Sequence, residues 1–328
     1  MNFKIITDFI NKYDKFIITA HETPDGDAIG SEYAMLRVLE KIGKKAKIFN
    51  ADPFPDDFKF LDPENRINVL KDKSQLPLDI ADYALLILDV NELNNIGNIA
   101  ELVVPFVKEY FIIDHHNFDI DLAGKNFIQK NASSTAEIIF QLLKKLNVDI
   151  ELDIANAIYT GLVYDTGSFI YPKTSALTFQ IAKELVSAGV HPNFIYRKVF
   201  ECKSVSFLML QAKVLSTLQF HADNRIAILK MLKKDLEESG APFYEGRSLI
   251  NMPLTSETVL VSIFFKENLE GVLRCSLRSK GNIDVAKIAY SYNGGGHKTA
   301  AGFKCSEPLE TVKENVLKIL ISTYFTEK

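Results

Sequence analysis

One stretch constrains the fold more than any other: Tyr110–Ile113 followed directly by Asp114-His115-His116. The first four residues are apolar and partly β-branched, a pattern typical of a short buried strand. A carboxylate and two imidazoles after such a strand lie where open α/β sheets place their ligands, at the carboxyl ends of the strands. An ordinary polar turn would explain one such cluster after a single strand, but it would not explain similar clusters after several strands.

The first predicted strand ends in a similar way. Residues 15–20 form an apolar run that leads into His21, and Asp25 and Asp27 follow in a loop that contains Pro and Gly. Helical spacing of apolar residues then begins and continues to Gly43. A helix cap explains Asp25 or Asp27 alone, but it does not explain two carboxylates together with a histidine.

Two further carboxylates stand at the ends of predicted elements. Asp89 follows the buried strand expected over residues 83–88, and Asp165 follows the helix expected over residues 155–164. A helix-like pattern around residues 96–107 connects the strand before Asp89 to the strand before Asp114.

Alternation of strand, loop and helix over residues 15–190 predicts a parallel α/β domain. Within it, Ser134 with Glu137 fits a capping box that opens another helix. After about residue 217 the pattern changes to short strands, which indicates a second, smaller α/β domain.

In this fold, four carboxylates and two imidazoles converge at one edge of the sheet. Unpaired carboxylates so close together would repel strongly, and two divalent cations would balance the four negative charges. Oxygen ligands mixed with imidazole favour Mn²⁺ over Mg²⁺. Two ions about 3.5–4 Å apart would lower the pKa of a water and clamp phosphoryl oxygens, so the pattern predicts phosphoester hydrolysis. The predicted ligands are His21, Asp25, Asp27, Asp89, His115 and Asp165.

The second domain carries a candidate anion pocket. Three glycines precede His297, and such a run permits close backbone approach to a phosphate or carboxylate. Period-two alternation places Arg274, Ser276 and Arg278 on one face of a strand, although a solvated strand face explains their spacing equally well.

Composition limits the classes of partner. The chain has 328 residues, 47% hydrophobic and 24% charged, with a formal net charge of −4, which argues against an extended groove for long nucleic acid. No apolar run reaches the roughly 18 residues needed to span a bilayer. The three cysteines lie far apart, which favours small buried side chains in a reducing cytoplasm over disulfides or zinc.

The motifs around His21, Asp89, Asp114-His115-His116 and Asp165 resemble, in order, those of the DHH phosphoesterase superfamily. The resemblance covers roughly the first 190 residues. It implies that His21, Asp25 and Asp89 hold one Mn²⁺, and that Asp89 bridges to a second. The implied ligands of the second ion are Asp27, Asp89, His115 and Asp165. It also implies that His116 donates to a substrate phosphate, with Asp114 orienting an imidazole.

The Gly-Gly-Gly-His run resembles the DHHA1 domain that accompanies DHH in one subfamily. There, the nucleotide end of a substrate would be gripped across a cleft between the domains. The binding residues implied by the resemblance are Arg274, Ser276, Gly295, Gly296 and His297, and the strand spacing adds Arg278 as a predicted binding residue. The expected organisation is a DHH catalytic domain at 1–190, a helical linker at 191–216 and a DHHA1 domain at 217–328.

Compact DHH–DHHA1 proteins resemble nano-RNases, which trim very short RNAs to mononucleotides, often with 3′-phosphoadenosine 5′-phosphate phosphatase activity. A phosphodiesterase for cyclic di-AMP or its linear product pApA is the close alternative. From another class, the chain could be a nucleotide sensor without turnover, although the complete ligand set argues against it. The expected partner is a short RNA or dinucleotide, without long nucleic acid or membrane, and a homodimer is allowed.

Overall fold

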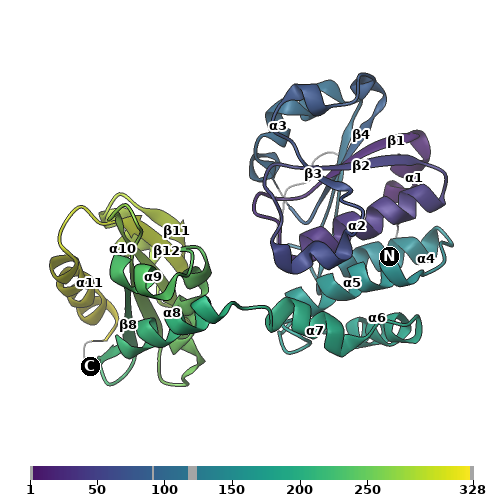
Figure 1. Cartoon of the computed structure of the whole chain (residues 1–328). Helices are drawn as coiled ribbons and strands as arrows, with labels where there is room; N and C mark the ends of the chain where they lie inside the picture. The colour runs from purple at the N-terminus through teal and green to yellow at the C-terminus, as the bar shows by residue number, and fades with distance from the viewer. Residues whose placement is uncertain (1–2, 91, 117–123, 326–328) are drawn as a thin grey trace. The chain divides into compact units, whose positions relative to one another are not determined.

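The computed structural model describes residues 3–90, 92–116 and 124–325. The chain divides into two compact units, Met1–Cys202 and Lys203–Lys328 (Figure 1). The segment predicted as a linker, 191–216, holds two helices, α7 (Pro192–Phe200) in the first unit and α8 (Val205–Ser216) in the second. The cleft expected between the domains stays a prediction.

The first unit is built on a six-stranded sheet in which every pairing is parallel. From β1 the chain adds β2 and β3 on one side of the sheet, and then β4, β5 and β6 on the other side of β1. The direction of winding therefore reverses between β1 and β4, and doubly wound folds bind their ligands at such a switch point. The spatial order of the strands is β3 (Ile67–Val69), β2 (Lys45–Asn50), β1 (Lys15–Thr19), β4 (Ala84–Leu88), β5 (Tyr110–Asp114) and β6 (Asn126–Ile128).

Helices and turns cover both faces of this sheet. All five residues of β4 are buried, which is why the central strands are continuous apolar runs. The larger core packs the helices against one face, and a smaller core around Leu85 and Ile87 packs the short α3 (Ile99–Leu102) against the other (Figure 1). The helices of the larger core are α1 (Lys4–Lys12), α2 (Gly26–Lys41), α4 (Thr135–Lys145), α5 (Leu152–Asp165), α6 (Ala176–Ser187) and α7.

Two glycines allow α2 and α5 to pack closely. A Cβ on Gly30 would lie 2.4 Å from the carbonyl oxygen of Ala157, and a Cβ on Gly161 would lie 2.5 Å from Asp27 Oδ1. This close packing holds the first turn of α2, with Asp27, against α4 and α5.

The second unit has a mixed six-stranded sheet. Pairing is antiparallel except between β8 and β9. The spatial order is β11 (Gly295–His297), β12 (Ala300–Lys304), β10 (Leu273–Ser279), β9 (Val261–Glu267), β8 (Ile226–Met231) and β7 (Gln219–His221).

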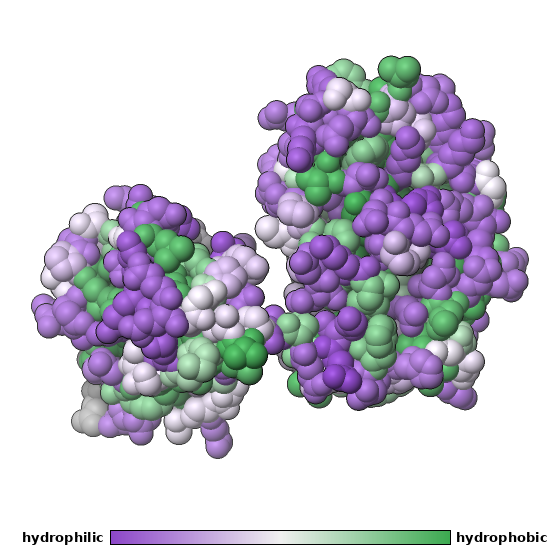
Figure 2. Space-filling model, viewed as in Figure 1, coloured by the Kyte–Doolittle hydropathy of each residue, from purple (hydrophilic) through white to green (hydrophobic). Residues whose placement is uncertain are grey.

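Each face of this sheet has its own core. One core contains side chains of α8 and α9 (Lys233–Ser239), and the other contains side chains of α10 (Ala286–Ser291) and α11 (Leu309–Tyr324). The predicted fold class, a parallel α/β domain followed by a smaller α/β domain, is confirmed. On the face of the molecule shown in Figure 2, hydrophilic side chains predominate and hydrophobic ones are scattered among them.

Two local expectations were wrong. The helix-like pattern over 96–107 folds as α3 alone, flanked by 3-10 turns at Leu93–Ile96 and Val104–Phe106, because Gly97 adopts a positive φ of 58° and Pro105 lacks an N–H. Ser134 does cap α4 through the Glu137 N–H, but the Glu137 carboxylate accepts from Ser133 and Thr178 instead of closing a capping box. Within the described ranges, every helix is too short or too polar to span a bilayer.

Candidate metal centre

The predicted ligands meet at the carboxyl edge of three adjacent strands. His21 follows β1, Asp89 follows β4, and His115 follows β5. The described residues contain three sets whose possible ligand atoms all lie within 4.8 Å of one another. These sets are His21–Asp25–Asp89, Asp27–His115–Asp165 and Asp89–Asp114–His115–His116.

Asp89 lies between the two histidines and turns one carboxylate oxygen to each. Its Oδ2 is 3.8 Å from His21 Nε2, and its Oδ1 is 3.5 Å from His115 Nε2. Two ligand atoms that are each about 2.1 Å from one ion lie roughly 3–4 Å apart, so both spacings would admit a cation. Asp89 has a φ of 57°, a left-handed conformation that costs an Asp less than most side chains and directs this carboxylate.

Both histidines present Nε2 to the carboxylates. His21 Nδ1 lies 2.7 Å from the carbonyl oxygen of Glu22, and His115 Nδ1 lies 3.3 Å from that of Ala132. An Nδ1–H that donates to a backbone carbonyl leaves Nε2 with its lone pair, which is the tautomer that binds metal. Lys173 Nζ also donates to the carbonyl oxygen of His115, at 2.9 Å, and lies 3.3 Å from its Nδ1.

The two carboxylates of the first loop each cap a different helix. Asp25 Oδ1 accepts the Asp27 and Ala28 N–H groups at the start of α2. Asp27 is fully buried, and its carboxylate accepts the N–H groups of Thr135 and Ala136 at the start of α4. Helix capping and ligand placement therefore use the same side chains, because Asp27 Oδ2 also faces His115 Nε2 at 3.9 Å.

The cluster carries more negative charge than its own residues can balance. Burial, then the charge of Asp165, raises the pKa of Asp27 to about 7. Burial and the surrounding aspartates raise the pKa of Asp89 well above its usual value. Burial opposes protonation of His115, but the carboxylates of Asp165 and Asp27 outweigh it and raise the pKa of His115. Divalent cations would supply the missing positive charge.

The chemistry of the donor set fits such ions. His115 Nε2 is buried and makes no hydrogen bond with any described atom, although Asp165 Oδ2 lies 2.9 Å away. A buried polar atom without a hydrogen bond costs free energy unless another partner satisfies it. The sets His21–Asp25–Asp89 and Asp27–His115–Asp165 each combine an imidazole with carboxylate oxygens, a mixture suited to a transition-metal dication.

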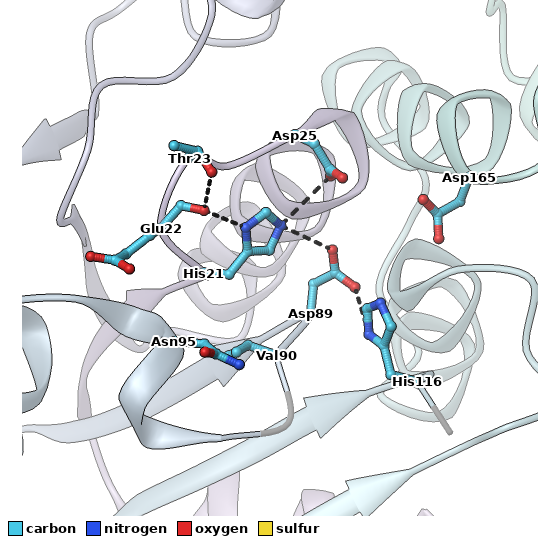
Figure 3. A pocket seen from close by; sticks show the side chains of 9 residues that line it. All are labelled: His21, Glu22, Thr23, Asp25, Asp89, Val90, Asn95, His116 and Asp165. Carbon is cyan, nitrogen blue, oxygen red and sulfur yellow. Dashed lines mark hydrogen bonds and ion pairs between the residues drawn. The ribbon is translucent and has the colours of Figure 1, made fainter. Parts of the chain in front are cut away.

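His116 and Asp114 form a hydrogen-bonded pair next to Asp89, whose Oδ1 lies 3.9 Å from His116 Nδ1 (Figure 3). Asp114 Oδ1 is 2.7 Å from His116 Nδ1 and also accepts the N–H of His115. Burial would raise the pKa of Asp114, but the hydrogen bond with His116 outweighs it and holds that pKa below its usual value. Because Nδ1 is engaged, the half-exposed ring of His116 has Nε2 available for another partner.

A cavity of about 470 Å³ opens over this arrangement (Figure 3). The predicted site residues that line the cavity are His21, Asp25, Asp89, His116 and Asp165. The additional lining residues are Glu22, Thr23, Val90 and Asn95, and Figure 3 shows Asn95 on the side opposite Asp25 and Asp165.

The sequence prediction missed Thr135, which holds two carboxylates at once. Its N–H donates to Asp27 Oδ2 at 2.6 Å and its hydroxyl donates to Asp89 Oδ1 at 3.0 Å. The run of hydroxyl residues at 133–135 was a signal, but only the cap at Ser134 was recognised from it.

In the second unit, the register of the strands gathers the predicted binding residues on one face. Arg278 pairs with Ala300, which pairs with His297, so these three form one row across β10, β12 and β11. Ser276, Gly302 and Gly295 form the next row. Small residues thus form a floor between the side chains of Arg278 and His297.

The end of the glycine segment, Gly295–His297, forms the edge strand β11. Gly296 has a φ of 138°, and a Cβ there would lie 2.4 Å from the carbonyl oxygen of Ala300. A Cβ on Gly294 would lie 2.3 Å from the carbonyl oxygen of Gly302. Strand packing therefore accounts for these two glycines, whereas a Cβ on Gly295 would meet only Tyr290, at an ordinary 3.9 Å.

Comparison with known proteins gives two domain matches. Residues 15–162 match the DHH family N-terminal domain, and residues 224–324 match the DHHA1 domain. The chain is 30% identical to the bifunctional oligoribonuclease and PAP phosphatase NrnA of Thermus thermophilus, over 87% of this chain and 82% of that one.

Two other relatives extend the comparison. The chain is 25% identical to the cyclic-di-AMP phosphodiesterase GdpP of Geobacillus thermodenitrificans, over 98% of this chain but only 49% of that longer protein. The crystal structure of an exopolyphosphatase-related protein from Bacteroides fragilis superimposes with a TM-score of 0.85 at 30% identity, over 97% of this chain and 95% of that one.

Proposed function

Because the chain belongs to the DHH family of metal-dependent phosphoesterases and carries a DHHA1 domain, we propose that it hydrolyses very short oligoribonucleotides and dinucleotides to mononucleotides. Phosphatase activity on 3′-phosphoadenosine 5′-phosphate would accompany it. The proposed cofactors are two divalent cations, Mn²⁺ in preference to Mg²⁺, because each ligand set includes an imidazole.

The observation that carries the proposal is the position of Asp89 between two ligand sets. With one oxygen facing His21 and the other facing His115, this carboxylate can serve two ions at once. The first ion would be held by His21, Asp25 and Asp89. The second would be held by the set Asp27, His115 and Asp165, joined by Asp89, whose Oδ1 lies 3.5 Å from His115 Nε2.

When bound, the two ions would supply a water of lowered pKa and positive charge on the phosphoryl oxygens. His116 would donate from Nε2 to a phosphate oxygen of the substrate, and Asp114 would hold its ring in place through Nδ1. Thr135 would fix Asp27 and Asp89 so that neither has to reorient during the reaction.

The second unit would bind the nucleotide end of the substrate. Arg278 and His297 offer cationic or hydrogen-bonding side chains on either side of the small-residue floor. The other proposed binding residues are Arg274, Ser276, Gly295 and Gly296.

Substitution of Asp89 by Asn tests the role of the bridging ligand. We expect Asp89→Asn to lower kcat with Mn²⁺ and a dinucleotide by roughly a thousandfold or more, since loss of an outer-shell partner alone costs about 10–100-fold. Asp149→Asn is the matched control, because Asp149 is an exposed carboxylate of the same unit outside the site. Retained turnover in a folded Asp89→Asn protein would contradict the two-ion centre.

A substrate panel separates the candidate activities. It compares pApA, cyclic di-AMP, RNA of two to five nucleotides and 3′-phosphoadenosine 5′-phosphate, each with Mn²⁺. The proposal expects the highest kcat/KM on the short RNAs. Turnover confined to cyclic di-AMP and pApA would favour the activity named for the GdpP relative, and binding without cleavage of any compound would favour a sensor.

A further inference from the structure

The loop between β1 and α2 carries two of the predicted metal ligands on either side of a strained residue. Thr23 has a φ of 51°, in the left-handed region that β-branched side chains rarely adopt, and it precedes Pro24, which restricts its backbone further. His21 and Asp25 lie on either side of it in the chain, with His21 Nε2 3.9 Å from Asp25 Oδ1. Strain of this kind persists only where surrounding contacts hold it.

The peptide unit between Glu22 and Thr23 is held at both ends. Its carbonyl oxygen, on Glu22, lies 2.7 Å from His21 Nδ1 and also accepts the Thr23 hydroxyl at 2.7 Å (Figure 3). Its N–H, on Thr23, donates to Asp52 Oδ2 at 3.0 Å. Because the C=O and the N–H of a trans peptide point in opposite directions, a contact that fixes one end also orients the other.

Asp52 reaches this peptide from a different part of the sheet, since it lies just beyond the end of β2. A neighbouring bond, from the Glu22 N–H to the Asn95 carbonyl oxygen at 2.8 Å, acts on the preceding peptide and does not orient the Glu22–Thr23 unit. If that unit turned over, its carbonyl would leave His21 and would face the Asp52 carboxylate, where two acceptors repel each other. The carboxylate therefore favours the orientation that the structure has.

The orientation of this peptide decides which nitrogen of His21 can serve a cation. With Nδ1–H donating to the Glu22 carbonyl, Nε2 keeps the lone pair that faces Asp25 and Asp89. A carboxylate that accepts from the other end of the same peptide also polarises it and strengthens its carbonyl as an acceptor. Asp52 is thus linked to the first ligand set by one peptide and one imidazole.

We propose that Asp52 is a positioning residue for the first ion of the centre, the ion beside His21. Asp52 belongs to none of the three ligand sets, so its effect passes through the Glu22–Thr23 peptide and the His21 ring. The inference rests on the proposed function and adds to it a residue that sets the affinity for one of the two ions. Loss of an outer partner of a ligand typically lowers metal affinity by about 10–100-fold.

Mn²⁺ binding to the full chain tests this without turnover. Electron paramagnetic resonance of free Mn²⁺ gives the number of bound ions and their Kd values for wild type, Asp52→Ala and Asp52→Asn. We expect Asp52→Ala to raise the Kd of one ion about tenfold and to leave the other within about threefold. Asp52→Asn should stay within about threefold of wild type for both ions, because its amide oxygen still accepts the Thr23 N–H.

A double-mutant cycle identifies the route. In a His21→Ala background, which lacks the imidazole of the first set, Asp52→Ala should change the Kd of the remaining ion by less than about twofold, since residues that act through one contact are not additive. Asp56→Ala is the matched control. It removes an exposed carboxylate of the same connection, paired with Lys59, and should leave both Kd values unchanged.

Three results would overturn the inference. The first is a folded Asp52→Ala protein with wild-type Kd values. The second is an equal loss of affinity in Asp52→Asn, which would assign the effect to charge alone, and the third is an equal loss in the His21→Ala background. If Asp52→Ala does not fold, Asp52→Ser is tested against the same expectations, because its side chain is one atom shorter than the bond to Thr23 requires.

Turnover separates this inference from the proposed function. With a dinucleotide, Asp52→Ala should need about tenfold more Mn²⁺ for half-maximal rate and keep kcat at saturating Mn²⁺ within about threefold. A loss of kcat that saturating Mn²⁺ does not restore would overturn the positioning role. If the Kd values change as expected but wild type cleaves no compound of the substrate panel, the proposed function fails while the role of Asp52 stands.

Discussion

At the scale of single residues, buried carboxyl groups outside the metal centre also constrain the chain. Glu32 on α2 is fully buried; its Oε2 accepts from Asn50 at 2.9 Å, and its Oε1 has no hydrogen-bond partner among the described atoms. Burial raises the pKa of Glu32 to about 8, so at neutral pH this side chain is a neutral acid in the folded protein.

Glu32→Gln should therefore change how stability depends on pH. Between the usual Glu pKa of about 4.3 and the folded value of about 8, only the folded state keeps the proton, so wild-type stability falls as pH rises, by up to about 1.4 kcal/mol per pH unit. Gln cannot ionise, so the Tm of the variant relative to wild type should be higher at pH 8.5 than at pH 6. A Tm difference independent of pH would contradict a buried neutral Glu32; Glu101→Gln, on an exposed side chain, is the control.

At the scale of elements, the metal centre depends on how closely α5 packs against α2 and α4. A Cβ on Gly161 would lie 2.5 Å from Asp27 Oδ1 and 2.6 Å from the Cβ of Ala136. The same packing aligns the first turn of α4 with the carboxylate of Asp27. The contact between the helices therefore also fixes the position of this predicted metal ligand.

Gly161→Ala tests this contact because two effects oppose each other. Helix propensity alone would stabilise the variant by about 1 kcal/mol. We expect instead a net loss of about 1–3 kcal/mol, because the new methyl overpacks the contact, together with weaker divalent-cation binding as Asp27 shifts. Asn156→Ala on the same helix should not destabilise the fold, and a stabilised Gly161→Ala protein with unchanged cation affinity would refute the packing account.

Local sequence patterns predicted most elements because the apolar spacing that defines an element is itself local. The strand before Asp89 and the helix after Asp27 were predicted in this way. The pattern failed at residues 96–107, where Gly97 and Pro105 interrupt the helix, and it gave no prediction for α1. The bonds from Thr135 to Asp27 and Asp89 join residues 108 and 46 positions apart, so no local pattern could show them.

At the scale of the whole molecule, chemistry and substrate binding are assigned to different units. The metal ligands all belong to the first unit, and the face with Arg278 and His297 belongs to the second. If the second unit only binds, its side chains should affect affinity more than the rate of the chemical step.

His297→Ala should raise KM for a dinucleotide about tenfold and leave kcat within about twofold, since it removes a contact remote from the reacting phosphate. Steady-state kinetics with Mn²⁺ give both constants. His191→Ala removes an exposed imidazole of the first unit and should change neither. A wild-type KM with a much lower kcat would place His297 in the chemistry.

The most direct test of the central claim is an anomalous-difference map from crystals grown with Mn²⁺. Two peaks about 3.5–4 Å apart should flank the Asp89 carboxylate, one beside His21 and Asp25, the other beside Asp27, His115 and Asp165. A single peak, or peaks that do not share Asp89, would contradict the two-ion centre.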